Sequence, residues 1–104
     1  MGRHTLRISI QQTDTEVEIT LEGRLAGAWV AELERAWSEA APRVSNQQVR
    51  LDLRNVTYSD LSGKHVLRTI FKQTSAEIIT SSQWSQYLAE EVRDTEQGRA
   101  RGEA

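Results

Sequence analysis

The spacing of apolar residues changes its period along this chain, and this change constrains the fold more than any other sequence feature. Apolar and polar residues alternate over 5–11 and again over 16–22, on either side of a polar turn at 12–15. A period of two is typical of a strand with one buried face, and so short a connection favours an antiparallel hairpin. We therefore predict a strand over 5–11 and a second strand that Gly23 closes. The inward-facing residues of these strands are Leu6, Ile8, Ile10, Val17, Ile19 and Leu21.

The period becomes helical over 26–41, where apolar residues recur every three or four positions with charged residues between them. This spacing predicts an amphipathic helix. Pro42, the only proline, ends the helix, and alternation returns in a third strand at Val49, Leu51 and Leu53. A strand, a helix and a strand in this order predict a right-handed parallel crossover.

The second half of the chain continues with helices and strands in alternation. After a predicted loop at 55–60, a helix begins that Asp60 or Ser59 is placed to cap. A fourth strand follows at 76–79, and a last helix begins near residue 81. The apolar stripes of these two helices consist of Val66, Leu67, Ile70 and Phe71, and of Trp84, Tyr87, Leu88 and Val92. We expect Trp37 and Trp84 in the core, since both lie on such stripes.

Charged residues within the third strand indicate the fold class. Arg50, Asp52 and Arg54 alternate with its apolar residues, whereas parallel strands that are buried on both faces usually read as continuous apolar runs. We therefore predict an α/β fold with a mixed four-stranded sheet and helices mainly on one face. A chain of 104 residues has room for one domain, which we place at 1–93. Residues 94–104 have no apolar face and are predicted to form a disordered tail.

Composition argues against several classes of function. The formal net charge is −2 and Lys and Arg are scattered, so the chain lacks the basic patch that attracts nucleic acid. Cysteine is absent and His4 and His65 lie far apart in sequence, so we predict no disulfide, no metal site and no cofactor. Because no continuous apolar stretch resembles a signal peptide or a membrane span, we expect a cytoplasmic protein that does not insert into membranes.

Two patterns invite an enzymatic interpretation, and neither is complete. Ser62 and His65 are three residues apart on a predicted helix, where they could touch, and Asp60 is nearby. The serine does not lie in a Gly-x-Ser-x-Gly elbow, and no oxyanion hole is evident. The turn at 23–27 has two glycines but lacks the Lys-Ser or Lys-Thr of a phosphate-binding loop. We therefore predict no catalytic residue and expect that the chain is not an enzyme.

Three short segments at the ends of predicted elements carry a family resemblance. They read LEGRL at 21–25, VRLDLRNV at 49–56 and YSDLSG at 58–63. Together with the order of strands and helices, they resemble the STAS domain of anti-sigma factor antagonists and sulfate transporter tails, over about residues 5 to 93. The resemblance implies a STAS-like mixed sheet and a bacterial protein-binding regulator of transcription.

The last of these segments differs from the family at its regulatory position. In antagonists of this family the loop usually reads Asp-Ser-Ser-Gly or Asp-Ser-Thr-Gly, and an anti-sigma kinase phosphorylates the serine that follows the aspartate. Here Leu61 occupies that position. Leucine has no hydroxyl, so Ser62 and Ser59 are the candidate phosphoacceptors. A phosphate in the first turn of a helix would meet free backbone N–H groups, and its charge would oppose the docking of a partner. Leu61 instead suits a constitutive apolar contact.

The resemblance also implies a class of partner. We expect an anti-sigma factor of the histidine-kinase-like type. The alternative is that the chain is a STAS-like cytoplasmic subunit of a lipid-transporting ABC system, which binds the transport ATPase and needs no phosphorylation. A structural or ligand-sensing module is a third reading, and the oligomeric state stays open. The predicted docking residues are Tyr58, Ser59, Asp60, Leu61, Ser62 and Gly63, together with Trp29 near the start of the first helix.

Overall fold

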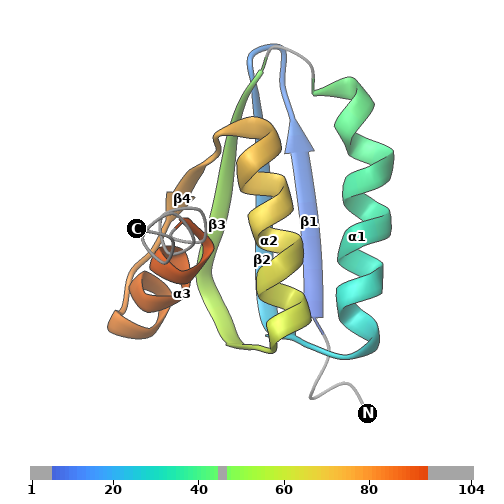
Figure 1. Ribbon diagram of the computed structural model, residues 1–104. Helices are drawn as coiled ribbons and strands as arrows, with labels where there is room; N and C mark the ends of the chain where they lie inside the picture. Colours follow the sequence, from blue (N-terminus) through green and yellow to red (C-terminus); the bar gives the residue numbers. More distant parts are fainter. Residues whose placement is uncertain (1–5, 45–46, 94–104) are drawn as a thin grey trace, which may run out of the picture.

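The hairpin, the crossover and the two later helices form one layer of sheet and one layer of helices in the computed structural model, which describes residues 6–44 and 47–93 (Figure 1). The strands are β1 (Leu6–Gln12), β2 (Glu16–Leu25), β3 (Gln48–Ser59) and β4 (Glu77–Ile79). The helices are α1 (Ala28–Ala40), α2 (Leu61–Thr74) and α3 (Gln83–Arg93), and a 3₁₀ turn, η1 (Ala41–Arg43), follows α1 and contains the proline. Residues 94–104, predicted to be a disordered tail, lie outside the described residues.

The strands pair in the order β1-β2-β3-β4 and form a mixed sheet. β1 and β2 are antiparallel, with Ile10 opposite Ile19, whereas β3 runs parallel to both β2 and β4. The predicted hairpin and the predicted parallel crossover through α1 are therefore confirmed. The sheet and its helices confirm the predicted α/β fold class.

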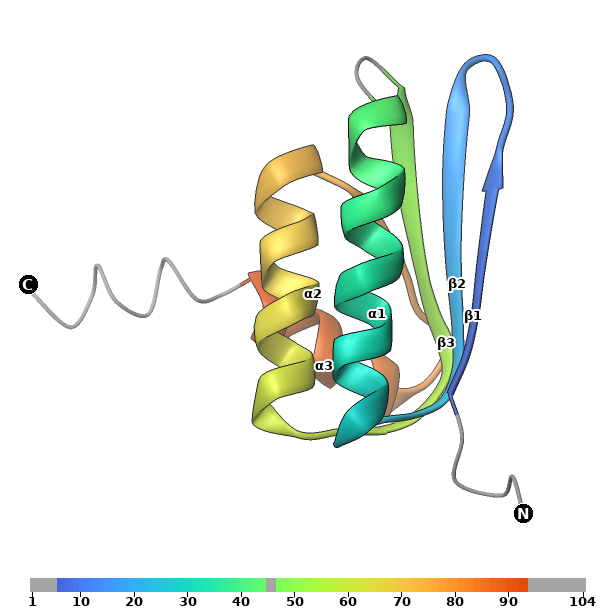
Figure 2. The ribbon, with the colours of Figure 1, turned by 90° about the vertical axis from the view of Figure 1, so that its right-hand side faces the viewer.

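All three helices lie on one side of the sheet (Figure 2), as the charged residues of the third strand predicted. The residues of β1, β2 and β3 that alternate inward form the core with the apolar stripes of the helices. Trp37 is buried as expected and Trp84 is half-buried against the core. Tyr87 was expected on the apolar stripe of α3, but 49% of its surface is exposed. The fully buried residues include Ile19, Leu21, Leu25, Leu33, Leu51, Leu53, Leu67, Ile70 and Leu88.

The face of the sheet opposite the helices holds the charged residues. Arg50 pairs with Glu77 of β4 at 3.6 Å. Asp52 is covered by Arg54, whose Nε and NH2 groups donate to its two carboxylate oxygens at 3.0 and 2.9 Å. These hydrogen bonds hold the pKa of Asp52 below its ordinary value. Ion pairing along the strands therefore accounts for the charges that interrupt the apolar pattern of the third strand.

Strands β2 and β3 extend further than the sequence pattern predicted. β3 runs to Ser59, so the expected loop at 55–60 is wrong, and β2 continues past Gly23 to Leu25. The pairing between them shifts twice, between Thr20 and Glu22 and again between Gly23 and Arg24, and Gly23 has a positive φ of 110°. Each shift places an extra residue in β3, which breaks the period of two.

The second half of β3 is also tied to α3. The indole Nε1 of Trp84 donates a hydrogen bond of 2.7 Å to the carbonyl oxygen of Val56, which lies within the irregular part of the strand. A bulge leaves backbone groups without a ladder partner, and this side chain supplies one. Among the described residues, no helix is long and apolar enough to cross a membrane.

Candidate functional site

The first turns of α1 and α2 lie next to each other at the end of the molecule where β2 and β3 finish (Figure 1). Asp60 joins them. Its Oδ1 accepts a hydrogen bond from the backbone N–H of Gly63 at 2.8 Å, and its Oδ2 accepts one from the N–H of Gly27 at 3.1 Å. Gly27 is the N-cap residue of α1, and Asp60 is the N-cap residue of α2, as predicted. One carboxylate therefore satisfies free N–H groups at the starts of both helices.

Gly63 lets α2 approach the sheet closely. A Cβ atom at this position would lie 2.6 Å from the hydroxyl oxygen of Ser59 and 2.7 Å from the carbonyl oxygen of Leu25. Those distances are too short for non-bonded atoms, so any side chain would push the first turn of α2 outward. The same carbonyl oxygen accepts a hydrogen bond from the N–H of Asp60 at 3.1 Å. Gly63 is therefore a packing residue beneath the surface.

Ser59 is also part of the interior. Only 6% of its surface is exposed, and its hydroxyl donates to the carbonyl oxygen of Asp60 at 3.1 Å. A partner protein or a kinase could not reach this hydroxyl without first displacing α2. The burial of Ser59 and Gly63 argues against direct contact with a partner in this conformation, and their roles in docking and phosphorylation stay predictions.

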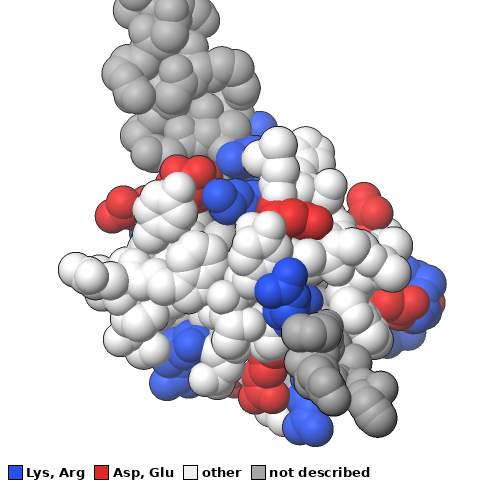
Figure 3. All heavy atoms as spheres, turned by 90° about the horizontal axis from the view of Figure 1, so that it is seen from below, with Lys and Arg blue, Asp and Glu red and all other residues white. Residues whose placement is uncertain are grey.

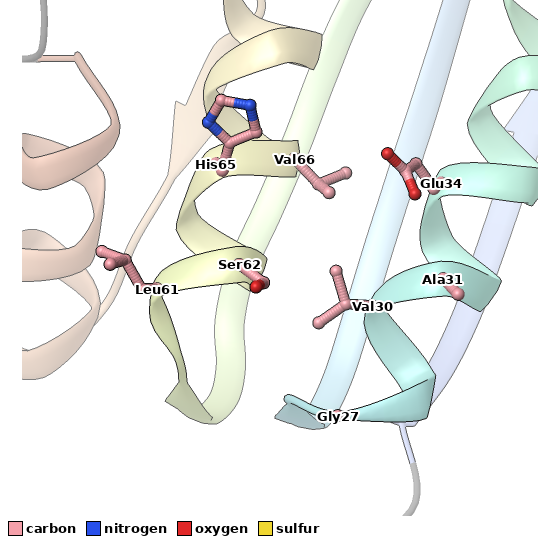
Figure 4. Close-up of a pocket in the computed structure, with 8 residues that line it drawn as sticks. All are labelled: Gly27, Val30, Ala31, Glu34, Leu61, Ser62, His65 and Val66. Atoms are coloured by element: carbon pink, nitrogen blue, oxygen red, sulfur yellow. The ribbon is translucent and has the colours of Figure 1, made fainter.

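Leu61 and Ser62 follow Asp60 and are both exposed. Leu61 has the most exposed large apolar side chain among the described residues, with 76% of its surface accessible. Figure 4 shows its side chain directed away from α1, whereas Ser62 lies on the side that faces α1. Seen from below, much of this end of the molecule is covered by uncharged residues, and the Lys, Arg, Asp and Glu side chains lie among them in small groups (Figure 3).

Tyr58 lies on a different surface from Leu61. It is paired with Arg24 on the neighbouring strand, and the guanidinium carbon of Arg24 lies 4.4 Å from the centre of its ring. Ser59 and Leu25, the next residues on these strands, are buried against the helices, so Tyr58 and Arg24 face the opposite side of the sheet. The predicted docking segment is therefore divided between two faces.

Trp29 lies in the first turn of α1 and is half-buried against the core. Its role as a contact for a partner stays a prediction.

A groove runs between α1 and α2 and begins beside Ser62. Its first part has a volume of about 510 Å³, and a second hollow of about 490 Å³ continues it along the helices. Glu34 and Val66 line both parts. The first part is lined by Gly27, Val30, Ala31, Glu34, Leu61, Ser62, His65 and Val66 (Figure 4). Sequence reasoning missed Glu34 because its position opposite α2 depends on how the two helices pack.

The enzymatic interpretation rests on Asp60, Ser62 and His65. No hydrogen bond joins Ser62 to His65 within residues 6–44 and 47–93, although both line the groove. In the same ranges, no three His, Cys, Asp or Glu side chains come together as a metal site would require. The carboxylate of Asp60 accepts hydrogen bonds from two backbone N–H groups.

Comparison with known proteins identifies the fold. No family model matches the sequence, and no curated protein sequence matches it either. A similar solved structure is that of an uncharacterized protein of the DUF3478 family from Shewanella loihica PV-4, described as having a SpoIIAA-like fold. It is 13% identical in sequence, with a TM-score of 0.55 over 84% of this chain and 79% of the other. The chain therefore has a SpoIIAA-like fold, as its resemblance to STAS domains implied.

Proposed function

We propose that this chain is a STAS-like regulator that acts in the cytoplasm by binding another protein at the end where α1 and α2 begin. The observation that carries the proposal is the exposure of Leu61 in a turn that the hydrogen bonds of Asp60 to Gly27 and Gly63 hold in place. A leucine that a partner covers completely contributes about 1.5–3 kcal/mol through apolar burial. An isolated exposed apolar side chain is common, but this one follows the residue that holds two helix starts together.

The turn is rigid enough to act as a docking element. Asp60 bonds to the first turn of each helix, and Gly63 holds α2 close against Leu25. A surface whose shape is already fixed loses little conformational entropy when a partner binds, so more of the contact energy contributes to affinity. This arrangement supports protein binding better than it supports catalysis.

The resemblance to anti-sigma factor antagonists suggests an anti-sigma factor of the histidine-kinase-like type as the partner. In such antagonists the residue after the aspartate is phosphorylated, and here that residue is Leu61. Ser62 is exposed at the next position and would hold a phosphate beside the free N–H groups of α2. We propose that binding is constitutive through Leu61 and that any phosphate control acts through Ser62.

The leucine also favours a second candidate. A small STAS-like subunit that supports a lipid-transporting ABC ATPase needs no phosphorylation, so Leu61 is compatible with that function without a further switch. The partner would then be the transport ATPase. The two candidates differ in the partner and share the docking surface.

Binding to purified candidates tests the proposal. Histidine-kinase-like anti-sigma factors and transport ATPases encoded in the same genome would be titrated with the full chain by calorimetry. We expect one of them to bind, and Leu61→Asp to weaken that binding at least tenfold while the chain stays folded, because a charge would have to be desolvated at the contact.

Tyr58→Asp is the matched control for this substitution. It introduces the same charge at another exposed large side chain, which faces the opposite side of the sheet beside Arg24. We expect it to leave the affinity nearly unchanged. Equal weakening by both substitutions, or none by Leu61→Asp, would contradict the proposed docking surface.

A further inference from the structure

The groove between α1 and α2 is long enough to hold a helix. Its two hollows meet at Glu34 and Val66 and extend from Ser62 to Gln73 along α2. The 13 residues of α1 span about 20 Å at 1.5 Å per residue, which corresponds to three or four helical turns. Two packed helices form a concave surface that accepts a third helix, as in other cases where a helix binds in a groove.

The floor of this groove is apolar. Val30, Trp37 and Val66 lie along it, each nearly buried between the two helices. The indole N–H of Trp37 already donates to Oε1 of Gln73 at 2.9 Å. A ligand over this tryptophan therefore has no polar group of the ring to satisfy, and apolar side chains suit the floor best.

The carboxylate of Glu34 places a negative charge over this floor. Figure 4 shows the carboxylate of Glu34 pointing from α1 toward α2. Within the part of the chain that the structure describes, it forms no ion pair, whereas Glu32 and Glu39 on the same helix both pair with Arg35. The lining of the groove contains no Lys or Arg. The complementary ligand therefore carries a positive charge near the middle of the groove.

The segment that follows α3 does not suit the groove as such a ligand. Residues 94–104 read DTEQGRARGEA, which includes arginines but no large apolar side chain to cover the floor. A second copy is equally unsuited. The exposed large apolar side chains of the described residues are Tyr58, Leu61 and Tyr87, which lie singly on three different elements. A helix of a partner protein therefore suits the groove better than residues 94–104 or a second copy.

We propose that the groove between α1 and α2 binds a basic amphipathic helix of the partner protein. Its apolar residues, spaced three or four apart, lie on Val30, Trp37 and Val66, and one Arg or Lys pairs with Glu34. This inference rests on the proposed function and names the chemistry of the partner segment that it would bind. Leu61 and Ser62 line the first part of the groove, so the bound helix would lie next to the docking turn.

Selection from a displayed library of 16-residue helical peptides tests the proposal on the full chain. The library carries apolar residues at i, i+4, i+7 and i+11 and random residues elsewhere. We expect the chain to enrich peptides with a central Arg or Lys, and Glu34→Arg to enrich peptides with Asp or Glu there. Glu90→Arg is the matched control, because Glu90 is an exposed helical glutamate on α3, outside the groove.

Binding constants and amide chemical shifts then locate the contact. An enriched basic peptide is expected to bind Glu34→Arg at least tenfold more weakly, since attraction becomes repulsion, and to shift amides of α1 and α2. The inference is overturned if the chain enriches no helical peptide, if both Glu34 forms enrich the same charge, or if the shifts fall on the open face of the sheet. Unchanged circular dichroism shows that the variants are folded.

The natural partner separates this inference from the proposed function. If Leu61→Asp weakens binding and Glu34→Arg does not, the docking turn is supported and the groove is not. If Glu34→Arg alone weakens binding, the groove is supported and the proposed role of Leu61 fails. If Leu61→Asp and Glu34→Arg both weaken binding, and Tyr58→Asp and Glu90→Arg do not, the docking turn and the groove are both supported.

Discussion

The double hydrogen bonding of Asp60 makes a quantitative prediction about stability. Asp60→Ala removes both the bond to Gly63 and the bond to Gly27. Loss of an N-cap costs about 1 kcal/mol. The second bond has a charged acceptor but an exposed setting, so we assign it about 1 kcal/mol as well, below the range of about 1.5–3 kcal/mol for bonds to charged groups. The free energy of unfolding should therefore fall by about 2 kcal/mol.

Asp60→Ser separates the two bonds. Serine is a good N-cap and can still accept a hydrogen bond from Gly63, but its single oxygen cannot also reach Gly27. We expect Asp60→Ser to lose about 1 kcal/mol, half the loss of the alanine variant. In a domain of this size, each kcal/mol lowers Tm by about 4–8 °C. The two variants should thus unfold at clearly different temperatures.

Urea unfolding followed by circular dichroism measures both values. The midpoint should decrease in the order wild type, Asp60→Ser, Asp60→Ala, with the same slope throughout, because the surface exposed on unfolding is unchanged. If serine and alanine destabilise the chain equally, the bond from Asp60 to α1 contributes nothing. If neither changes the midpoint, the carboxylate does not hold the two helix starts together, and the rigid docking turn loses its basis.

Two further substitutions test the packing of α2 and the open face of the sheet. Gly63→Ala should lower the free energy of unfolding by about 1–2 kcal/mol, because overpacking against Leu25 and Ser59 outweighs the higher helix propensity of alanine. An unchanged urea midpoint would show that α2 can move outward at little cost. Asp52→Asn should destabilise the chain at pH 7, because Arg54 lowers the pKa of Asp52 in the folded state. The stabilisation by Asp52 is lost when its carboxyl is protonated, so the difference between wild type and variant should shrink as the pH falls below 3.8. A difference in the free energy of unfolding that stays constant with pH would contradict this reasoning.

The position of the candidate docking turn depends on the irregular pairing of β2 and β3. Two register shifts lengthen β3 to Ser59 and bring its end to the starts of α1 and α2. Because β2 ends at Leu25 on the neighbouring strand, the backbone of Leu25 can bond to Asp60 and contact Gly63. The candidate docking turn is therefore a product of strand pairing as well as of helix capping.

Part of the candidate site could be predicted from the sequence. Asp60 precedes a helical pattern and was expected to cap it, because capping is a local property of a few residues. The burial of Ser59 and the separation of Tyr58 from Leu61 could not be predicted. Both follow from β3 continuing through 55–59, where bulges replace the period of two that identifies a strand.

The sequence alone determined the order of strands and helices, the mixed sheet with one covered face and the cap of α2, because periodicity and capping act between residues close in the chain. Only the tertiary structure decided that one carboxylate bonds to both helix starts, and that Glu34 faces α2 across an apolar groove. Gly27 and Asp60 are 33 residues apart in sequence, and no local pattern relates them. Their contact exists because the parallel crossover returns the chain to the same end of the sheet.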